Sequence, residues 1–459
     1  LASAEGDITE DIDLIEGLEN TKKISIDIGR KSEKALQTQQ EIKVTSEKYR
    51  PVADRSALLF FLMNDLVKMH TYYIYSLAAF LRVFYRGINK CMAKVEGVEY
   101  VEHDEVEDDG PKEVNEHDMH ANDLTDEQLA ERCTLLLNEI TETVYLYLER
   151  GLFVKDKLTV ATLLTIKILV NDGLLEQASS EFLIQSKVAV DPGNMGALAE
   201  WLPDAVWSRV KGLGGYAKFK NLGDNMQGDS DDWQVWFDQP KPEDAKLPGD
   251  YQKVCNEFDR LILLRAMRPD RVTAALVTWI DHVMGKTYVT QPVFDMKACY
   301  SESSPQTPTF FVLFAGTDPT PWVEGLAREL DITTENGRFC NISMGQGQEK
   351  PAESCVSKYA VEGGWVMLQN CHLMHESGWV PKLERLLEQV SEHAHPDFRC
   401  FISAEPPAVF NFKNMPESLM QSCIKVANEA PADIKSNMMR SWSRFNQEMI
   451  DGCTKSQAF

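Results

Sequence analysis

The most regular pattern of hydrophobic and polar positions lies between residues 308 and 428. Short apolar runs, rich in β-branched and aromatic residues, alternate there with segments whose apolar residues recur at helical spacing. The runs are Phe310–Phe314, Phe339–Met344, Trp365–Gln369, Phe398–Ser403 and Cys423–Ala427, and the helical segments are Pro319–Leu330, Gln348–Val361, Gly378–Ser391 and Pro416–Ser422. Strands that alternate with helices predict an α/β fold, with a five-stranded parallel sheet covered by helices on both faces.

The turn after the first strand is where such a fold would hold phosphate, because ligands bind at the carboxyl ends of parallel strands. A working phosphate loop needs several glycines, a Lys for the β- and γ-phosphates and a Ser or Thr for the metal. This turn offers Gly316, Thr317 and Asp318 and no Lys, and the Asp318 carboxylate would repel phosphate. Pro319 and Pro321 also remove backbone N–H donors. The sequence therefore predicts a degenerate phosphate-loop position.

The third strand ends in Gln369 and Asn370, where a hydrolysing module would carry acids that hold Mg²⁺ and orient water. Both side chains are neutral, which makes this a degenerate metal-acid position. We therefore expect a nucleotide-fold module that has lost its chemistry. The segment should contain no catalytic residue, no bound cofactor and no metal.

Two other motifs carry weaker chemical signals. Four residues after the third strand could form a nucleophile–base pair or a metal site, but they also suit a polar loop after a buried strand. They are Cys371, His372, His375 and Glu376. Separately, Gly285-Lys286-Thr287 spells the end of a phosphate loop. The glycine required five residues earlier is missing, and a helix is expected before the triplet instead of a strand, so we expect no phosphate site there.

Residues 8–48 are polar, helical in pattern and free of proline. A heptad seam runs through them, but about half of its positions are polar or small, as at Ser25 and Gln39. Pro51 then interrupts the pattern, and residues 53–90 resume as a more apolar helix. Two long helices joined by a short proline turn predict an antiparallel hairpin. It is either an ordinary surface hairpin or a projecting strut whose weak seam lets it bend or slide.

Residues 96–127 predict a flexible acidic insertion, with fourteen acids against the single base Lys112. His103, His117 and His120 lie in it, and histidines in such a loop are usually without a metal. Thr125 and Gln128 then form a capping box that opens a helix. Buried helices follow to about residue 170, and helices are expected again at 258–267 and up to residue 282. The tryptophans at positions 201–236 suit core packing better than a ligand cage.

Composition narrows the function classes. A chain of 459 residues predicts two or three domains, and 43% hydrophobic residues supply material for their cores. The net charge of −24, with no long basic run, disfavours sequence-specific nucleic-acid or anionic-membrane binding. Ten scattered cysteines without a C-x-x-C pair indicate neither a zinc site nor a disulfide framework, so reduced thiols are expected. No apolar run has transmembrane length, no signal peptide precedes the first segment, and both ends look cut from a longer protein.

Several motifs resemble the dynein heavy chain family. Tyr49–Ala53, followed by an apolar helix, resembles the helical hairpin of the fifth ring module, and Leu263–Arg271 resembles the sequence ahead of the sixth. Four further motifs are similar to the core of the sixth module and keep the family's order: Pro308–Phe311, Gly345–Gln348, Trp365–Leu373 and Phe401–Pro406. The resemblance covers nearly the whole chain apart from the acidic insertion, and its character is axonemal.

The resemblance implies a domain order and a role. Residues 1–95 would be the buttress hairpin and small subdomain of the fifth AAA+ module, 96–127 the acidic insertion, 128–300 a helical linker with the first part of the sixth module, and 301–459 the α/β core of the sixth module without its small subdomain. The buttress of the family braces the microtubule-binding stalk. ATP and Mg²⁺ would act in other modules. An arginine finger is expected near the last strand, but residues 414–422 contain no Arg.

Two functions from different classes remain at this point. The first is a non-hydrolysing structural and mechanical segment of a minus-end-directed microtubule motor in the axoneme of cilia or flagella. Its partners would be the neighbouring ring modules and the stalk, the microtubule indirectly, and dynein intermediate and light chains. The second is an active nucleotide-binding AAA+ enzyme with an atypical phosphate loop. The missing Lys and the missing acids favour the first.

Overall fold

The computed structural model describes residues 12–98, 100, 125–185, 187–290, 292, 294–314, 317–409, 412–429 and 434–442. Most of the expected acidic insertion, with its three histidines, lies outside these residues, as does Gly316. The chain divides into two compact units, one of residues 1–57 and 107–139 and the other of residues 58–106 and 140–459. Among the described helices, none combines the length and apolar character needed to cross a bilayer. The expected boundaries of the modules stay predictions.

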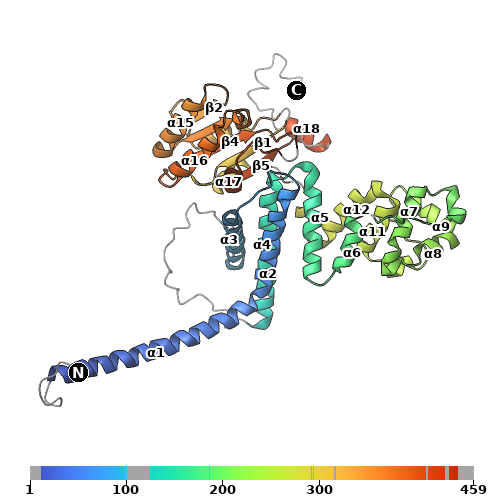
Figure 1. The fold of residues 1–459 in the computed structure, drawn as a ribbon, viewed down its shortest axis with the longest axis horizontal. Helices are drawn as coiled ribbons and strands as arrows, with labels where there is room; N and C mark the ends of the chain where they lie inside the picture. The colour runs from blue at the N-terminus through green and yellow to red at the C-terminus, as the bar shows by residue number, and fades with distance from the viewer. Residues whose placement is uncertain are drawn as a thin grey trace. The chain divides into compact units, whose positions relative to one another are not determined.

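Helices dominate both units (Figure 1). The helices of the first 300 residues are α1 (Ile12–Lys48), α2 (Arg50–Asp65), η1 (Leu66–Lys68), α3 (Leu77–Glu96), α4 (Asp126–Gly151), α5 (Val154–Asn171), α6 (Gln177–Ile184), η3 (Gly196–Glu200), α7 (Asp204–Gly212), η4 (Leu213–Gly215), η5 (Ala217–Phe219), α8 (Leu222–Gly228), α9 (Ser230–Phe237), α10 (Tyr251–Val254), α11 (Glu257–Met267), η6 (Pro269–Arg271), α12 (Val272–Met284), η7 (Lys286–Tyr288) and α13 (Met296–Ser301). The α/β part contains β1 (Thr309–Leu313), α14 (Thr320–Glu329), β2 (Phe339–Ser343), α15 (Glu349–Glu362), β3 (Trp365–Gln369), η8 (Cys371–Met374), α16 (Val380–Ser391), β4 (Arg399–Ala404), α17 (Glu417–Ser422), β5 (Ile424–Asn428) and α18 (Ile434–Trp442).

The expected antiparallel hairpin at Pro51 is wrong. Tyr49 is the one residue between α1 and α2, and backbone bonds continue across it, from the Tyr49 N–H to the Ser46 carbonyl (3.1 Å) and from the Val52 N–H to the Tyr49 carbonyl (3.0 Å). Pro51 lies in the first turn of α2, where its missing N–H costs no helical hydrogen bond. The proline therefore helps to begin a helix, and Figure 1 shows the chain bending between α1 and α2 without turning back.

The second helix of that expected hairpin is also interrupted, because α2 ends at Asp65 and α3 begins only at Leu77. The residues between them turn three tyrosines inward: Tyr72, Tyr73 and Tyr75 are each at most 6% exposed. Ser76 then starts α3, its side chain accepting a hydrogen bond from the Ala79 N–H. Burying the three tyrosine rings stabilises this irregular segment more than continuing the helix would. The capping box of Thr125 and Gln128 forms at the start of α4, as expected.

The five-stranded sheet is parallel throughout, in the order β2-β3-β4-β1-β5. All five strands and the helices between them lie within a residue or two of their expected positions, which confirms the α/β fold. The strands β1 and β4 are buried along their whole length, and the aromatic residues Phe310, Trp365 and Phe401 are fully buried in the core. Burial on both faces is the reason for their unbroken apolar sequence.

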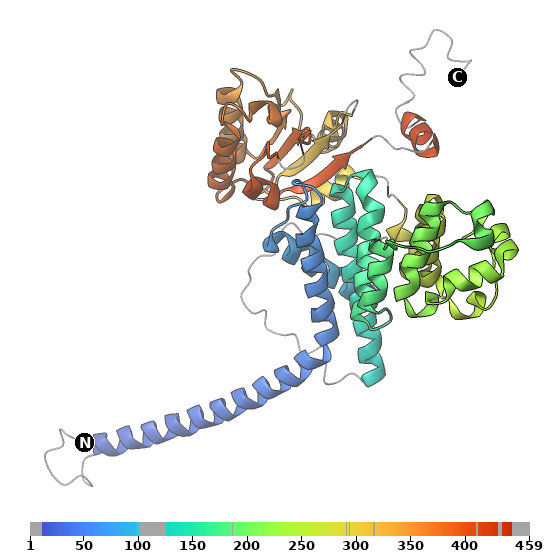
Figure 2. The same cartoon turned by 45° about the vertical axis from the view of Figure 1, so that its right-hand side comes forward.

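The order of the strands decides which face each helix covers. The chain runs from β2 to β3 and from β3 to β4 in one direction across the sheet, but from β1 back to β2 in the other. Right-handed crossovers therefore put α15 and α16 on one face and α14 on the opposite face. Figures 1 and 2 show α15 and α16 side by side, and they pack against each other.

The edge strand β5 is covered by the segment between α2 and α3. The Ser76 N–H donates to the Gln421 carbonyl just before β5, and Lys425 in the strand donates from Nζ to the Ile74 carbonyl at 2.6 Å. The Lys425 ammonium also lies 3.8 Å from the centre of the Tyr75 ring. A Cβ on Gly151 would stand 2.9 Å from the Tyr75 hydroxyl oxygen, so this close approach requires glycine.

Burial lowers the pKa of Lys425 to about 7, although Cys423 acts in the opposite direction. The lysine is only 2% exposed, so its charged form loses most of its hydration. A separate buried ion-paired cluster joins distant segments of the chain: Arg150 and Arg86 both contact Glu302 Oε2, at 2.6 and 3.1 Å. Burial alone would raise the pKa of Glu302, but the two guanidinium groups outweigh it and lower that pKa.

We predict that Lys425 makes the stability of the chain depend on pH above neutrality. Between the folded pKa of about 7 and the unfolded value of 10.5, the unfolded chain holds a proton that the folded chain does not. The contribution of Lys425 to the free energy of unfolding therefore rises with pH in this window, by up to about 1.4 kcal/mol per pH unit. Lys425→Met should remove that slope in urea unfolding measured from pH 6 to 10.

The matched control is Lys413→Met, because Lys413 is exposed and pairs with the exposed Glu417. This variant should keep the pH slope of the original chain. Equal slopes for Lys425→Met and the original chain would show that the buried amine stays charged across this range, contrary to the prediction.

Candidate functional site

The candidate site is the carboxyl edge of the sheet, where a nucleotide would bind in a fold of this kind. The turn after β1 and the end of β3 meet there. Within the described part of the chain, Thr317, Asp318, Gln369 and Asn370 have defined places at this edge, whereas Gly316 lies outside it. The polar atoms of these residues bond to one another and to the backbone.

Asp318, Thr320 and Gln369 form a hydrogen-bonded chain across the edge. Asp318 Oδ1 accepts from both the backbone N–H and the hydroxyl of Thr320, at 2.9 and 2.6 Å. Thr320 Oγ1 in turn accepts from Gln369 Nε2 at 2.7 Å. The side chain at the metal-acid position is therefore tied to the residues of the phosphate-loop position. A carboxylate at 369 could not donate this bond, so the neutral amide fits this arrangement.

Thr317 also uses its hydroxyl internally. Its Oγ1 donates to the Phe314 carbonyl at 2.7 Å and accepts from the Phe314 N–H at 3.1 Å. The Thr317 N–H donates to the same carbonyl at 3.0 Å. A phosphate loop would point such a hydroxyl at a metal ion. Here the hydroxyl closes a turn at the end of β1.

Asn370 has a left-handed backbone, with φ of 58° and ψ of 38°. Asn tolerates this region better than most residues, and the conformation leads directly from β3 into η8. The Asn370 N–H donates to Ser403 Oγ at 3.2 Å, which joins the ends of β3 and β4. In the sequence, Asn370 is a neutral residue at a position where an acid would hold a metal. In the structure it also forms the turn from β3 into η8.

The residues after Asn370 do not form a nucleophile–base pair or a metal site. His372 Nδ1 accepts from the Glu405 N–H at 3.1 Å, and burial lowers the pKa of His372 while the Glu405 carboxylate opposes this. Cys371 is fully buried, and burial raises its pKa to about 12. The His375 ring packs edge-on against Phe412, with centroids 5.0 Å apart. No group of three or more His, Cys, Asp or Glu side chains in the described ranges is arranged to hold a metal ion.

The structure also agrees with the sequence-based interpretation of the Gly285-Lys286-Thr287 triplet and of the buried tryptophans. Gly285-Lys286-Thr287 follows helix α12 and leads into the short helix η7, so it is not a phosphate loop. Trp207, Trp233 and Trp236 are buried in the helical part, with at most 3% of each exposed. These three serve as core residues, whereas Trp201 is half-buried.

Sequence reasoning missed a hollow beside the carboxyl edge. It has a volume of about 390 Å³ and lies between the ends of β1, β4 and β5 and the start of α5. Its lining is His70, Phe153, Lys155, Phe314, Pro406, Pro407, Ala408 and Glu429. The Phe153 ring packs edge-on against Phe314 at 5.1 Å, and Glu429 accepts from the Val154 N–H at 3.0 Å. Aromatic and proline residues fill most of the wall, and no sequence signal joins these distant segments.

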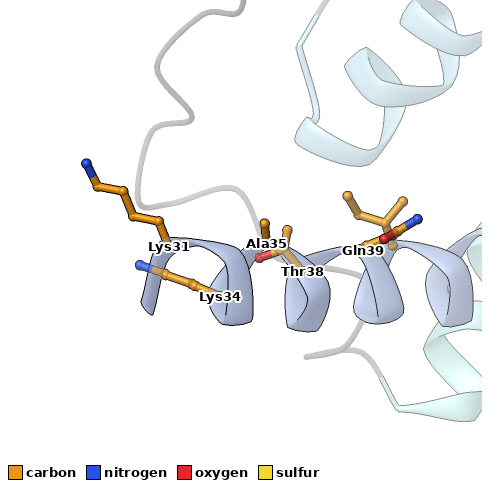
Figure 3. Close-up of a pocket in the computed structure, with 6 residues that line it drawn as sticks. Lys31, Lys34, Ala35, Thr38 and Gln39 are labelled. Carbon is orange, nitrogen blue, oxygen red and sulfur yellow. The ribbon is translucent and has the colours of Figure 1, made fainter. Parts of the chain in front are cut away.

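A second hollow lies along α1 and is lined by one helix only: Lys31, Lys34, Ala35, Thr38, Gln39 and Ile42 (Figure 3). All six residues are exposed. Because a ligand site buries most of its ligand, a surface formed by one face of one helix does not make one.

We predict that Thr320 and Gln369 are energetically coupled. Thr320→Val and Gln369→Met should each lower the free energy of unfolding by about 1–2 kcal/mol, because each leaves a polar partner without its bond. The double variant should show a coupling energy of about 1 kcal/mol in urea unfolding.

A control cycle pairs Gln369→Met with Thr278→Val, whose hydroxyl bonds to the Ala274 carbonyl in α12. That pair should be additive. A coupling energy near zero for the pair of Thr320 and Gln369 would show that their hydrogen bond does not hold the edge together.

Comparisons with known proteins agree with this architecture. Residues 304–427 match the family model described as the dynein heavy chain region D6 P-loop domain. The chain is 39% identical to the dynein alpha chain of the flagellar outer arm of Chlamydomonas reinhardtii, over 98% of this chain and 11% of that protein. It is 36% identical to the dynein beta chain of the same flagellar outer arm, and 35% identical to the human dynein axonemal heavy chain 9, in both cases over 100% of this chain.

The chain spans only about a tenth of the length of these relatives, 10% and 9% for the latter two. The likeness runs through both compact units, and the matched model covers the parallel sheet and its carboxyl edge. These findings show that the chain belongs to the dynein heavy chain family, with residues 304–427 forming its region D6 P-loop domain.

Proposed function

We propose that this chain is a non-hydrolysing structural and mechanical segment of a dynein heavy chain motor ring. In this proposal it relays ATP-driven conformational change toward the microtubule-binding stalk of a minus-end-directed motor. Its place would be the axoneme of a cilium or flagellum, in keeping with the flagellar and ciliary names of its relatives.

The proposal rests on the hydrogen bonds that the side chains at the carboxyl edge make to protein groups. Hydrolysis needs a cation and a metal-bound hydroxyl at the phosphates and an acid that holds Mg²⁺. The described residues at these positions are Asp318, Thr317 and Gln369, and each bonds to protein groups instead. Freeing them would cost hydrogen bonds, and the Asp318 carboxylate would still face phosphate. This supports a segment that carries no ATP or Mg²⁺ of its own and depends on other modules for both.

The proposed partners follow from the same role. They are the neighbouring ring modules and the stalk of the same heavy chain, the microtubule indirectly, and the intermediate and light chains of the complex. The alternative function is an active nucleotide-binding AAA+ enzyme with an atypical loop, and a direct binding measurement separates the two.

We predict that the chain has no ATP affinity in the micromolar range. Calorimetric titration of the 459-residue chain with ATP and Mg²⁺ should give no saturable heat at up to millimolar nucleotide, because the turn at residues 314–321 contains no Lys or Arg for phosphate. Asp318→Ala, which removes the repelling carboxylate, should not create binding, since the Lys and the metal acid are still missing. Micromolar binding by the original chain would favour the enzyme.

The proposed transmitting element is α1 with the first turns of α2. In place of the expected hairpin, the chain forms two nearly continuous helices, and the helical bonds pass through Tyr49. Residues 19–40 of α1 are all exposed, including Ile24, Ile28 and Leu36. A stiff element of this kind can transmit displacement only if the helix stays intact at its bend.

We predict that softening this bend uncouples the motor. Replacing Lys48 and Tyr49 by glycine should cost about 1 kcal/mol of helix stability per position and make the junction flexible. In a full-length motor, ATP turnover should persist while microtubule affinity loses part of its dependence on nucleotide state.

The matched control replaces the same two residues by alanine, which removes the same side chains and keeps the helix. It should behave like the original motor. If the glycine variant keeps full coupling between nucleotide state and microtubule affinity, α1 does not transmit the change.

A further inference from the structure

Two cysteines from different elements meet beside β2, one of the two outer strands of the sheet. Cys340 lies in β2, the edge strand opposite β5, and Cys355 lies in α15, the helix that follows β2. Their sulfur atoms are 2.8 Å apart. Both residues are half-buried, so a small reagent can reach them.

The distance is close to what a covalent bond requires. A disulfide holds its sulfur atoms about 2.05 Å apart, so these two would have to approach by about 0.8 Å. β2 pairs with β3 on one side only, and no described strand lies on its other side. A small movement of this edge strand or of a side-chain torsion therefore suffices to close the gap.

The other described cysteines lack these features. Five of them are buried, and for them access by an oxidant is poor: Cys91, Cys299, Cys371, Cys400 and Cys423. Cys133 is half-buried and its thiol donates to the Lys48 carbonyl. Cys255 is half-buried, and burial raises its pKa to about 11.

We propose that Cys340 and Cys355 form a reversible disulfide site, oxidised by peroxide and reduced by dithiols. This inference does not depend on the proposed function. It concerns the pair as a modification site on the sheet edge, whichever role the rest of the chain has.

The reaction can be written with peroxide as the two-electron oxidant. The Cys355 sulfur attacks one oxygen of hydrogen peroxide, the O–O bond breaks, and the released hydroxide leaves as water with the thiol proton. The resulting Cys355 sulfenic acid is then attacked by the Cys340 sulfur. The S–S bond forms, the S–O bond breaks, and the hydroxyl leaves as a second water with the Cys340 proton.

The proposal places the first attack at Cys355, because burial penalises the charged form of Cys340. Burial raises the pKa of Cys340 to about 12, with a further contribution from its hydrogen bond to Cys355, and Lys358 opposes these effects only partly. The proposal therefore assigns the resolving role to Cys340, and the Cys340→Ser variant tests this assignment. The disulfide would close a loop from residue 340 to 355, which includes the Gly345–Gln348 turn at the carboxyl edge, and would fasten α15 to β2.

The test oxidises the folded 459-residue chain with hydrogen peroxide, blocks free thiols with N-ethylmaleimide, and maps peptides without reduction. We expect one cross-linked pair containing Cys340 and Cys355, two hydrogens lighter than the separate peptides and restored by dithiothreitol. It should form at least tenfold faster than Cys133 or Cys255 is oxidised. The oxidised chain should melt a few degrees higher, because the cross-link restricts the unfolded state.

Variants make the assignment specific. Cys340→Ser should lose the cross-link and accumulate a Cys355 sulfenic acid that dimedone traps, whereas Cys133→Ser, the matched control, should cross-link as the original chain does. The proposal is overturned if both peptides are recovered alkylated after peroxide treatment. It is equally overturned if the cross-link forms only in urea, or if oxidation lowers the melting temperature.

Discussion

The covering of the parallel sheet is the constraint on which the rest of the structure depends. A parallel sheet is apolar on both faces, and it cannot leave them in water. Crossover helices solve this over most of the sheet, but β5 at the edge needs other residues. The segment between α2 and α3 supplies them, with its buried tyrosines and the bond from Lys425 to the Ile74 carbonyl. Through this contact the sheet is packed against the helical part of its own unit.

Ligands bind at the carboxyl edge of a parallel sheet, and in this chain the described polar side chains at that edge bond to protein groups. Asp318, Thr320 and Gln369 satisfy one another, and Thr317 bonds back to Phe314. An edge completed in this way gains stability from groups that a hydrolysing module would keep available for nucleotide and metal. Under the proposed function, the fold would serve through its shape and its contacts, as a mechanical segment of a motor requires.

The strands and their helices could be predicted from sequence, because the period of the apolar residues changes clearly between them. The sequence also shows that the turn after the first strand lacks a phosphate-binding Lys and that the end of the third strand lacks metal-binding acids. The bend at Tyr49 was not, since a proline in the first turn of a helix and a proline in a turn have similar neighbours. The left-handed Asn370, and the meeting of Cys340 with Cys355, depend on how distant segments pack. Local pattern carries no information on either.

The central claim is that the carboxyl edge is closed by its own side chains. The most direct test is an experimental structure of the chain determined with excess ATP and Mg²⁺. We expect no nucleotide beside the turn after β1, and the bond between Gln369 Nε2 and Thr320 Oγ1 should remain near its 2.7 Å. ATP with Mg²⁺ held by that turn, and Gln369 turned away from Thr320, would contradict the account.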